Sequence, residues 1–362
     1  MNLPQNAYIH IPFCNSKCFY CAFISTCNLK LETGYLISLL KDIDTNYQKN
    51  VLSTLYYGGG TPSLLPLEHV KKIQNKFILD KNSEVTFEIN PENVSIQYLQ
   101  GLKDIGINRL SIGIQSFNNR ILKLIGRKHT AEQGLTTIEL AQNVGFDNIS
   151  LDFIYGLPTQ SLEGFINDLK TAINLGIPHI SLYGLKIEEN SVFGKKTPKN
   201  LPNEDSQADM YLEAINILKD FNHYEISNFA KNGYESRHNL TYWQNRPYYG
   251  FGCGAHGYEN NIRYANSFRI HEYMKTPLTR DYCHFETEEE RLEEEIFLGF
   301  RISKGLNINE INKKFDIDFC QKYKDILNKY IETGHIIKID NGFRLSNTGF
   351  LISTVILAEF LQ

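Results

Sequence analysis

The pattern of apolar and polar positions up to about residue 230 predicts short strands that alternate with amphipathic helices. In the helix expected at 33–47, for example, Leu36, Leu39 and Ile43 recur at helical spacing. The other expected helices cover 67–78, 96–105, 119–125, 131–144, 162–175 and 205–221. A first apolar strand leads into Cys14, and later strands are expected at 54–57, 84–89, 109–115, 149–155 and 179–185, with an extended piece near 224–229.

This order of elements predicts an α/β fold with a parallel sheet and right-handed crossover connections. Six strand–helix units are compatible with an open doubly wound sheet or with a partial (β/α)6 barrel. In both architectures, ligands bind at the carboxyl ends of the strands. The residues expected at those ends are polar or glycine: the cysteine loop, 58–61, Glu88, Asn90, Gln115, Asp152 and Lys186. The sequence therefore predicts a ligand site at this edge of the sheet.

The alternation stops after about residue 230, which divides the chain into expected domains of 1–230 and 231–362. Residues 237–257 are rich in aromatic, glycine and polar residues and are expected to be dominated by loops. A winged-helix-like unit is expected at about 288–362, with helices at 288–301, 308–315 and 319–333, a strand pair at 336–339 and 343–345, and a last helix from Thr348. Its charges are mixed and no basic recognition helix stands out, which favours packing or partner docking over DNA binding.

Composition narrows the class of protein further. The 362 residues carry a formal net charge of −4, which does not indicate binding to nucleic acid or to a membrane surface. Seven cysteines, scattered except for three near the N-terminus, do not form a disulfide framework. The sequence indicates no signal peptide, and no run approaches the about 18 apolar residues of a spanning helix. We therefore expect a soluble cytoplasmic protein.

Three cysteines, Cys14, Cys18 and Cys21, follow the first strand at the spacing C-x3-C-x2-C. Three thiolates on one loop can hold three corners of an iron–sulfur cluster. A closed zinc site would need a fourth donor, and nothing indicates that Cys27 returns to the loop. Free cysteines are often merely small buried residues, but this trio flanks loop residues rather than following strand or helix periodicity. The spacing thus favours a cluster with one iron open to another ligand.

A second motif, Gly58-Gly59-Gly60-Thr61-Pro62-Ser63, lies between a strand and a helix. Glycines allow backbone N–H and C=O groups to approach a ligand closely. The loop lacks the glycine order of dinucleotide sites and the Gly-Lys-Ser/Thr of a P-loop. It is therefore interpreted as a loop that contacts an amine or a carboxylate, although alone it could be only a turn.

Together, the cysteine trio and the glycine loop resemble the radical S-adenosylmethionine (radical SAM) superfamily. The resemblance implies a partial (β/α)6 barrel in which three cysteines bind a 4Fe-4S cluster and the open iron chelates the amino and carboxylate groups of SAM. It assigns SAM contacts residue by residue: Tyr8, Tyr20, Gly59, Gly60, Thr61, Glu88, Gln115, Arg127 and Asp152. Taken singly, Glu88 and Asp152 could be strand-end carboxylates whose hydrogen bonds are satisfied within the protein, and Arg127 could be a surface residue. Their joint occurrence at successive strand ends favours the site.

More closely, the chain resembles the oxygen-independent coproporphyrinogen III oxidase family over nearly its whole length, through 8–14, 58–62, 111–117 and 152–158. This family contains oxidases, which decarboxylate porphyrinogen propionates, and heme chaperones of the HemW type. Oxidases carry a fourth cysteine where this chain has Phe23, and a longer segment before the cluster. The run His238-Asn239-Leu240-Thr241-Tyr242-Trp243 matches the H-N-x-x-Y-W motif of the heme-binding branch. These three observations favour a heme chaperone over an oxidase.

The resemblance gives this motif a role in heme binding. An imidazole such as His238 can ligate heme iron, and Tyr242 with Trp243 offers flat apolar area with polar edges. Without the resemblance, the motif would be interpreted as a cluster of buried aromatic side chains that contains a hydrogen-bonded histidine. Arg237 could meet a propionate and His256 is a second candidate ligand, whereas His10 is expected to be a packed strand residue.

The function implied by the resemblance is therefore a heme chaperone that binds a 4Fe-4S cluster, SAM and heme and delivers heme to hemoproteins. The alternative is the oxidative decarboxylation of coproporphyrinogen III to protoporphyrinogen IX, and a DNA-binding regulator is the least favoured class. No nucleic-acid partner is expected. Homodimer formation and peripheral contact with membrane hemoproteins are left open.

Overall fold

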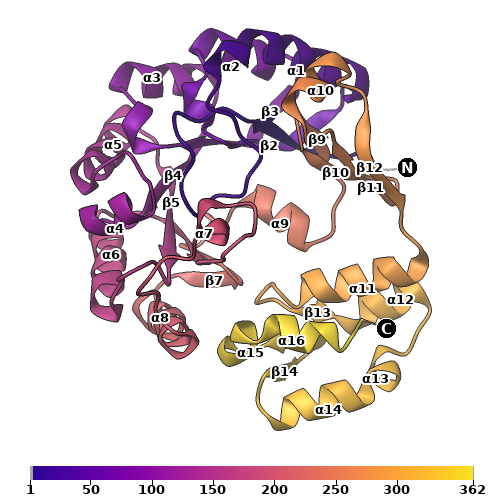
Figure 1. Ribbon diagram of the computed structural model, residues 1–362. Helices are drawn as coiled ribbons and strands as arrows, with labels where there is room; N and C mark the ends of the chain where they lie inside the picture. The colour runs from indigo at the N-terminus through magenta and orange to yellow at the C-terminus, as the bar shows by residue number, and fades with distance from the viewer. Residues whose placement is uncertain (1–2, 362) are drawn as a thin grey trace.

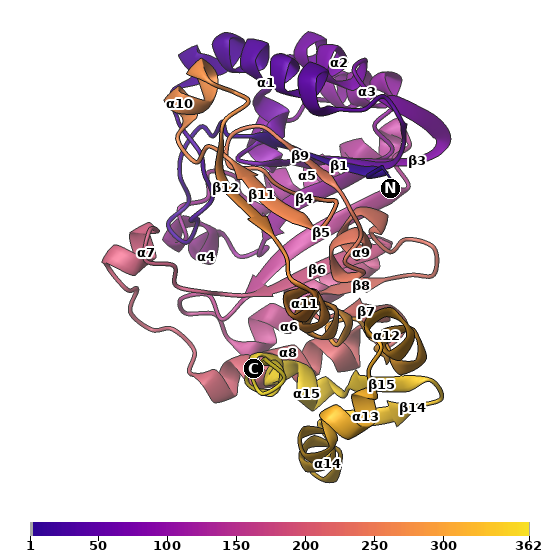
Figure 2. The same cartoon turned by 90° about the vertical axis from the view of Figure 1, so that its right-hand side faces the viewer.

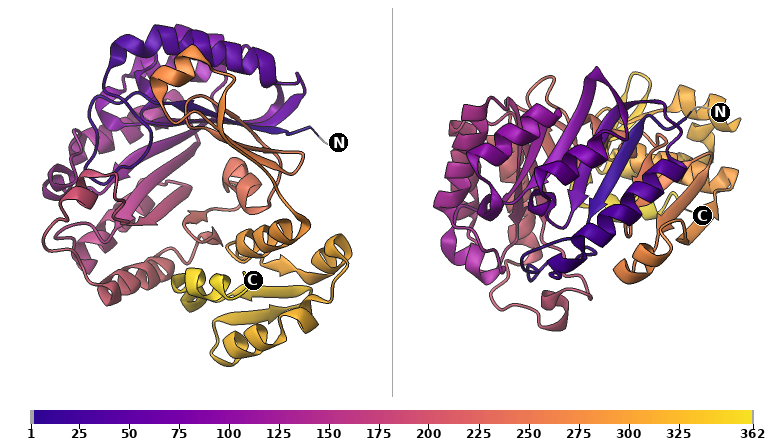
Figure 3. Two further views of the ribbon diagram at one scale, coloured as in Figure 1. Left: turned by 45° about the vertical axis from the view of Figure 1, so that its right-hand side comes forward. Right: turned by 90° about the horizontal axis from the view of Figure 1, so that it is seen from above.

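The computed structural model describes residues 3–361 and is built around one curved nine-stranded sheet (Figure 1). Its strand order is β7-β8-β6-β5-β4-β3-β2-β1-β9. The six strands from β1 to β6 are mutually parallel, and their bounds are Asn6–Ile11, Val51–Gly59, Ile78–Ile89, Arg109–Gln115, Asn148–Tyr155 and His179–Gly184. This arrangement confirms the predicted α/β class and shows that the sheet is a partial barrel open on one side (Figure 3).

Helices cover the convex side of the sheet, as the view from above shows (Figure 3). The covering helices are α1 (Glu32–Asn46), α2 (Leu67–Gln74), α3 (Ile96–Ile105), α4 (Asn119–Leu124), α5 (Ala131–Val144), α6 (Leu162–Asn174) and α8 (Glu204–Ile217), with a short α7 (Val192–Lys195) in a loop. Local sequence accounts for their ends. Thr130 and Gln133 form a capping box at the start of α5, and Gly145 ends it with a φ of 90°.

The barrel strands have an apolar outer face and a polar inner face because side chains alternate along a strand. The outer residues, such as Leu55, Phe87 and Leu151, are fully buried under the helices. The inner residues include Tyr56, Glu88, Ser111, Asp152 and Tyr183, which all line a single cavity. The inner face of the barrel therefore lines a cavity rather than forming part of the hydrophobic core.

One strand beyond residue 230 joins the barrel sheet, so tertiary structure crosses the predicted boundary. Antiparallel β7 (Asn222–Glu225) and β8 (Asn228–Ala230), which lie before the boundary, extend one edge, and β9 (Tyr249–Phe251), which lies after it, pairs with β1 at the other. Between them lies a helix, α9 (Arg237–Trp243), where loop structure was expected. Glu84 of β3 accepts hydrogen bonds from the first two N–H groups of this helix, both at 3.0 Å. The loop prediction was wrong here: the helix has a local N-cap in Ser236, whose side chain accepts from the Asn239 N–H at 3.3 Å, and a second acceptor in Glu84, which is distant in sequence.

A second, antiparallel sheet was not predicted. Its strands are β10 (His256–Glu259), β11 (Ile262–Asn266) and β12 (Arg280–Phe285), and α10 (Ile270–Lys275) lies between the last two (Figure 2). Buried Asp42 of α1 joins this region to the barrel. Its carboxylate accepts hydrogen bonds from the Gly252 N–H at 3.2 Å, the Asn266 amide at 3.2 Å and the Tyr273 hydroxyl at 2.8 Å.

A second hydrophobic core lies in the C-terminal unit and includes Tyr211 of α8. The unit contains α11 (Glu288–Gly299), β13 (Leu306–Asn307), α12 (Ile308–Phe315), α13 (Phe319–Lys322), α14 (Lys324–Glu332), β14 (Ile336–Ile339), β15 (Gly342–Leu345), α15 (Asn347–Leu351) and α16 (Ser353–Ala358). The sheet order β13-β15-β14 and the preceding helices confirm the expected winged-helix-like arrangement. Within residues 3–361, no helix combines the length and apolar character needed to span a membrane.

Candidate functional site

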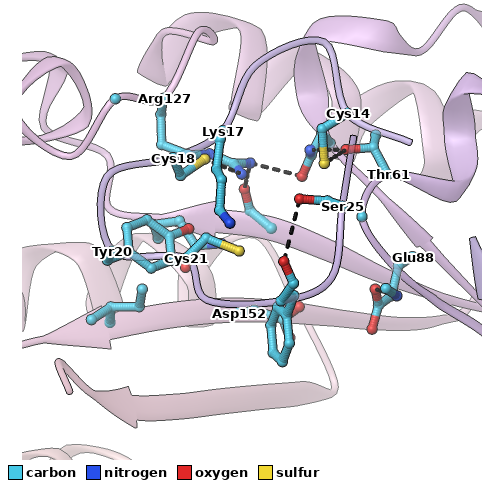
Figure 4. A pocket seen from close by; sticks show the side chains of 18 of the residues that line it. Cys14, Lys17, Cys18, Tyr20, Cys21, Ser25, Thr61, Glu88, Arg127 and Asp152 are labelled. Atoms are coloured by element: carbon cyan, nitrogen blue, oxygen red, sulfur yellow. Dashed lines mark hydrogen bonds between the residues drawn. The ribbon is translucent and has the colours of Figure 1, made fainter. Parts of the chain in front are cut away.

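A cavity of about 540 Å³ lies at the carboxyl ends of the barrel strands. Figure 4 shows side chains from the cysteine loop and from several strand ends around it. The predicted site residues that line it are Cys14, Cys18, Tyr20, Cys21, Gly59, Gly60, Thr61, Glu88, Gln115, Arg127 and Asp152. The structure thus brings together the cysteine trio and eight of the nine residues to which the resemblance assigned SAM contacts.

Backbone hydrogen bonds hold the cysteine loop over the barrel. The N–H of Cys14 donates to the carbonyl of Thr26 at 3.0 Å, and the N–H of Thr26 donates to Pro12 at 2.7 Å. On the other side, the N–H of Phe19 donates to the carbonyl of Ile125 at 3.0 Å. Both stems of the loop are therefore anchored, which positions the three thiols at the cavity.

A chain of polar side chains connects two of the sulfur atoms (Figure 4). Arg127 donates to Cys18 Sγ at 3.8 Å and to Asn90 Oδ1 at 2.9 Å. Asn90 donates to Thr61 Oγ1 at 2.9 Å, and Thr61 donates to Cys14 Sγ at 3.7 Å. Hydrogen bonds to sulfur stabilise the thiolate form that binds iron. Arg127 is buried and is not the surface residue that its sequence position alone would indicate.

The donor set fits a three-thiolate iron–sulfur cluster. In the described part of the chain, no three His, Cys, Asp or Glu side chains are grouped to hold a single metal ion. A 4Fe-4S cluster offers a separate iron to each thiolate, so its ligands need not converge on one point. Burial raises the pKa of the Cys14 and Cys21 thiols, a cost that iron binding would offset. Cys27 is exposed and does not line the cavity, so it supplies no fourth ligand there.

The glycine loop packs directly on the cysteine loop. A Cβ atom at Gly60 would lie 2.6 Å from the Phe13 carbonyl oxygen and 3.0 Å from Cys14 Sγ. The Gly60 N–H donates to Ile11 at 2.8 Å, and the Thr61 N–H donates to Phe13 at 2.7 Å. Only glycine permits this approach, which explains the requirement for a glycine in the loop.

Two carboxylates lie below this loop in the barrel interior. Glu88 accepts hydrogen bonds from the Tyr56 hydroxyl at 2.9 Å and the Gly59 N–H at 3.1 Å. Burial raises the pKa of Glu88 to about 7, and the charge of Asp152 adds to this effect. Asp152 accepts from Ser111 Oγ at 2.9 Å, and burial raises its pKa as well. These carboxylates are suited to bind a cation or hydroxyl groups.

Tyr8 is the SAM-contact candidate that does not line the cavity. Its hydroxyl is hydrogen bonded to His10 Nδ1 at 3.1 Å, and its ring stacks on Tyr56 with centroids 6.1 Å apart. His10 in turn is hydrogen bonded to the Ile24 carbonyl at 2.9 Å, consistent with the expected packed strand histidine. Tyr8 therefore supports the cavity wall from behind Tyr56.

The candidate heme motif lies on α9, separated from the cavity by Tyr56. His238 is 1% exposed, and its ring stacks on Tyr56 with centroids 4.9 Å apart. Its Nδ1 is hydrogen bonded to Thr54 Oγ1 and its Nε2 to the Tyr242 hydroxyl, both at 2.7 Å. In this conformation neither ring nitrogen is available to iron, so heme ligation by His238 would require both hydrogen bonds to break.

The other candidates for heme contact are scattered. Trp243 lies 5.9 Å from the Arg301 guanidinium of the C-terminal unit. Arg237 donates hydrogen bonds to the carbonyls of Asn82 and Ser53 at the base of the barrel. His256 is exposed on β10 and does not line the cavity. The structure thus does not gather these residues into one site.

Replacing His238 by glutamine is expected to change how stability depends on pH. Burial lowers the pKa of His238 to about 3 in the folded chain, whereas an exposed histidine titrates near about 6.5. Because the unfolded chain takes up the proton first, the stability that neutral His238 contributes is fully present only above the unfolded pKa of about 6.5 and falls as the pH decreases toward 3. The wild-type minus variant difference in unfolding free energy should decrease by about 1.4 kcal/mol per pH unit in this range.

Urea unfolding of both chains between about pH 5 and pH 8 measures this difference. Other buried groups are common to both chains and cancel in the comparison. A difference that does not vary with pH would contradict a neutral, buried His238.

Sequence reasoning missed several residues of the site. Tyr56, Ser111 and Tyr183 line the cavity, and buried Arg109 lies among the inner side chains, where its charge lowers the pKa values of Glu88 and Asp152 against the effect of burial. The period-two alternation of polar residues along the strands is the signal that could have identified them.

Comparisons with known proteins agree with this geometry. A family model described as the Radical SAM superfamily matches residues 8–172, and one described as the HemN C-terminal domain matches residues 287–352. The structure resembles that of coproporphyrinogen III oxidase (HemN) from Escherichia coli, described as a radical SAM enzyme, with a TM-score of 0.86. The alignment covers 99% of this chain and 90% of that one, and 21% identity makes it evidence for the fold alone.

Relatives with higher sequence identity to this chain are named heme chaperones rather than oxidases. The chain is 38% identical to the heme chaperone HemW of Lactococcus lactis subsp. lactis, over 96% of each chain. It is 36% identical to the heme chaperone HemW of Bacillus subtilis, over 99% of each chain. Identity of this extent over nearly complete chains shows that this protein belongs to the HemW heme chaperone family of the radical SAM superfamily.

Proposed function

We propose that this protein is a heme chaperone that binds a 4Fe-4S cluster, SAM and heme, and transfers heme to recipient hemoproteins. The observation that carries the proposal is the single cavity in which three thiols and the strand-end polar residues meet. The relatives that match almost the whole chain are named heme chaperones, which supports the second half of the proposal.

The cavity suggests how its residues would hold the cofactors. Cys14, Cys18 and Cys21 would ligate three irons, and a bound cluster supplies an open iron for the amino and carboxylate groups of SAM together with one electron. Arg127, whose Nε has no hydrogen-bond partner among the described residues, is suited to a carboxylate. Glu88 and Asp152 are suited to the amine or to ribose hydroxyls, and Tyr20 to the adenine.

The same proposal includes the remaining site residues and the domain division. Gly59, Gly60, Thr61 and Gln115 would contact SAM, with Tyr8 supporting them. His238, Tyr242 and Trp243 would contact heme once the two hydrogen bonds of the His238 ring are broken. We propose a barrel domain of residues 1–230, to which β9 adds an edge strand, and a C-terminal domain of 231–362. Homodimer formation, membrane contact and a cytoplasmic location stay predictions.

Phe23 favours the chaperone over the oxidase. It occupies the position where the oxidases resembled by this sequence carry a fourth cysteine, and its side chain is 68% exposed. A phenylalanine offers no ligand and no redox chemistry at this position.

Heme transfer tests the function directly. We expect the anaerobically reconstituted protein, once loaded with heme, to restore the heme spectrum of an apo-hemoprotein mixed with it. We also expect it not to convert coproporphyrinogen III to protoporphyrinogen IX with SAM and reductant present. Anaerobic turnover of the porphyrinogen without heme binding would overturn the chaperone in favour of the oxidase.

A further inference from the structure

One cation is enclosed in the barrel beneath the cofactor cavity. Arg109 is the first residue of β4 and is only 1% exposed. Positions two residues apart on a strand share a face, so Arg109 is on the same inner face as Ser111 and Gly113, which both line the cavity. Arg109 itself does not line it. Its guanidinium therefore lies below the cavity floor, where a charge is poorly screened by water.

Arg109 lacks the directed contacts of a structural arginine. A buried guanidinium normally donates several hydrogen bonds from its five N–H groups. The Nε of Arg109 has no hydrogen-bond partner among the described residues, and neither does the hydroxyl of Thr86, its register partner on β3. Within residues 3–361, Arg109 also forms no ion pair. What Arg109 contributes to the barrel is therefore mainly its charge.

The strand that carries Arg109 lies between the strands of the two cavity carboxylates. On one side, β4 pairs with β3, where Glu88 is opposite Ser111. On the other side, β4 pairs with β5, where Asp152 is opposite Gly113. Ser111 and Gly113 are the next two inner positions after Arg109 on β4. The two carboxylates thus flank the strand of Arg109, toward the cavity.

Two buried carboxylates require a nearby positive charge to stay ionised. Their hydrogen-bond donors are neutral: the Tyr56 hydroxyl and the Gly59 N–H for Glu88, and the Ser111 and Ser150 hydroxyls for Asp152. The charge of Asp152 raises the pKa of Glu88, in addition to burial, whereas the charge of Arg109 lowers the pKa of both carboxyls. Arg109 is thus their counter-charge on the inner face.

The other titratable groups around the two carboxylates are neutral near pH 7. Burial raises the pKa of the four tyrosines and lowers the pKa of the two histidines, to which the charge of Arg109 adds. The histidines therefore do not replace the charge of Arg109. These groups are Tyr8 of β1, Tyr56 of β2, His179 and Tyr183 of β6, and His238 and Tyr242 of α9.

We propose that Arg109 is a positioning residue of the SAM site, whose charge holds Glu88 and Asp152 in the ionised form that binds the cationic cofactor. This inference rests on the proposed function, because it concerns the SAM site. SAM carries a sulfonium and an amino group, and a carboxyl attracts a cation only when it is ionised. Arg109 acts through the two carboxylates and does not itself reach the cavity.

Equilibrium dialysis with SAM between about pH 6 and pH 8.5 tests this role in wild type, Arg109→Gln, Arg109→Lys and Arg120→Gln. Loss of the charge in Arg109→Gln should move the midpoint of the pH dependence upward by about one unit. At about pH 7, SAM binding should be about fivefold weaker, because the ionised fraction of Glu88 falls from about one half to about one tenth.

Arg109→Lys keeps the charge and should stay within about twofold of wild type at each pH. Arg120→Gln is the control, because Arg120 is exposed on α4 and does not line the cavity. Circular dichroism and iron content confirm that each chain folds and holds its cluster. Equal weakening at every pH in Arg109→Gln, without rescue by lysine, would show a purely structural role and overturn the proposal.

A double variant provides a second test if Arg109→Gln alone fails to fold. Glu88→Gln with Arg109→Gln removes one charge of each sign, and the loss of Glu88 also removes its repulsion of Asp152. The double variant should therefore bind SAM within about twofold of Glu88→Gln alone. Binding that is more than about fivefold weaker would show that Arg109 does not act through the carboxylates.

The outcomes separate this role from the proposed function. Wild-type protein that holds its cluster but binds no SAM would overturn the SAM part of the proposed function. SAM binding with the same pH midpoint in wild type and folded Arg109→Gln would overturn only the role of Arg109.

Discussion

Replacing Cys18 by alanine is expected to abolish the iron–sulfur cluster. Iron should fall from about four atoms per chain in reconstituted wild type to fewer than about one, with loss of the broad visible absorbance of thiolate-bound iron. The physical reason is that Cys14 and Cys21 alone leave two irons without a protein ligand. Arg127 would also lose the sulfur atom that accepts its hydrogen bond at 3.8 Å. Iron and sulfide analysis of the anaerobically reconstituted chains provides the measurement.

Cys27→Ala is the matched control for this experiment. Cys27 lies in the same segment of the chain but is exposed and outside the cavity. It should therefore retain wild-type iron and sulfide. Equal cluster content in Cys18→Ala and wild type would contradict the assignment of the three ligands, and loss in Cys27→Ala would indicate a fourth.

Glu88→Gln is expected to weaken SAM binding by roughly 10- to 100-fold, the range of a hydrogen bond to a charged group. Glutamine has the same shape but removes the negative charge that faces the cavity. In wild type, the pKa of Glu88 is raised by burial to about 7. The carboxylate is therefore charged above that pH and protonated below it, so affinity for a cationic ligand should fall as the pH decreases through 7. In the variant this pH dependence should be reduced.

Equilibrium dialysis with SAM at about pH 6, 7 and 8 measures both effects. Glu68→Gln is the control, because the Glu68 side chain is 71% exposed on α2, outside the cavity. Cluster content is checked in each sample, since loss of the cluster would also lower SAM affinity. Affinity that is unchanged in Glu88→Gln at every pH would exclude this carboxylate from the site.

The sequence was most informative where local signals are strong. The helices at 96–105 and 131–144 and the strand at 109–115 were predicted with the bounds they have in the structure. In the two helices apolar periodicity agrees with the burial of one face, and α5 also carries its own capping box, whereas the strand is buried on both faces. Local and tertiary preferences agree in these elements, which is why periodicity alone sufficed.

The errors occur where distant residues decide the structure. The α9 helix begins where Glu84 of β3 accepts from its N-terminal N–H groups, a contact across more than 150 positions. The β9 strand has three residues and exists because β1 offers it an edge. Neither contact leaves a local pattern, and the one local signal, the N-cap Ser236 of α9, is too weak alone to indicate a seven-residue helix.

By itself, the sequence determined the parallel α/β order, the cysteine trio, the glycine loop and the polar strand ends. These features depend on short spacing and on the rule that parallel strands place their carboxyl ends at one edge. Only the tertiary structure decided which of these residues share a cavity, and it placed Asn90 and Arg127 between two sulfur atoms.

The histidines show the same division most clearly. The motif at 238–243 matched a heme-binding pattern in sequence, but Thr54 and Tyr242 occupy both nitrogens of His238 in the fold. The sequence determines which side chain stands at a position. Whether that side chain is available to bind a ligand depends on its burial and its hydrogen-bond partners, which only the packing of the fold decides.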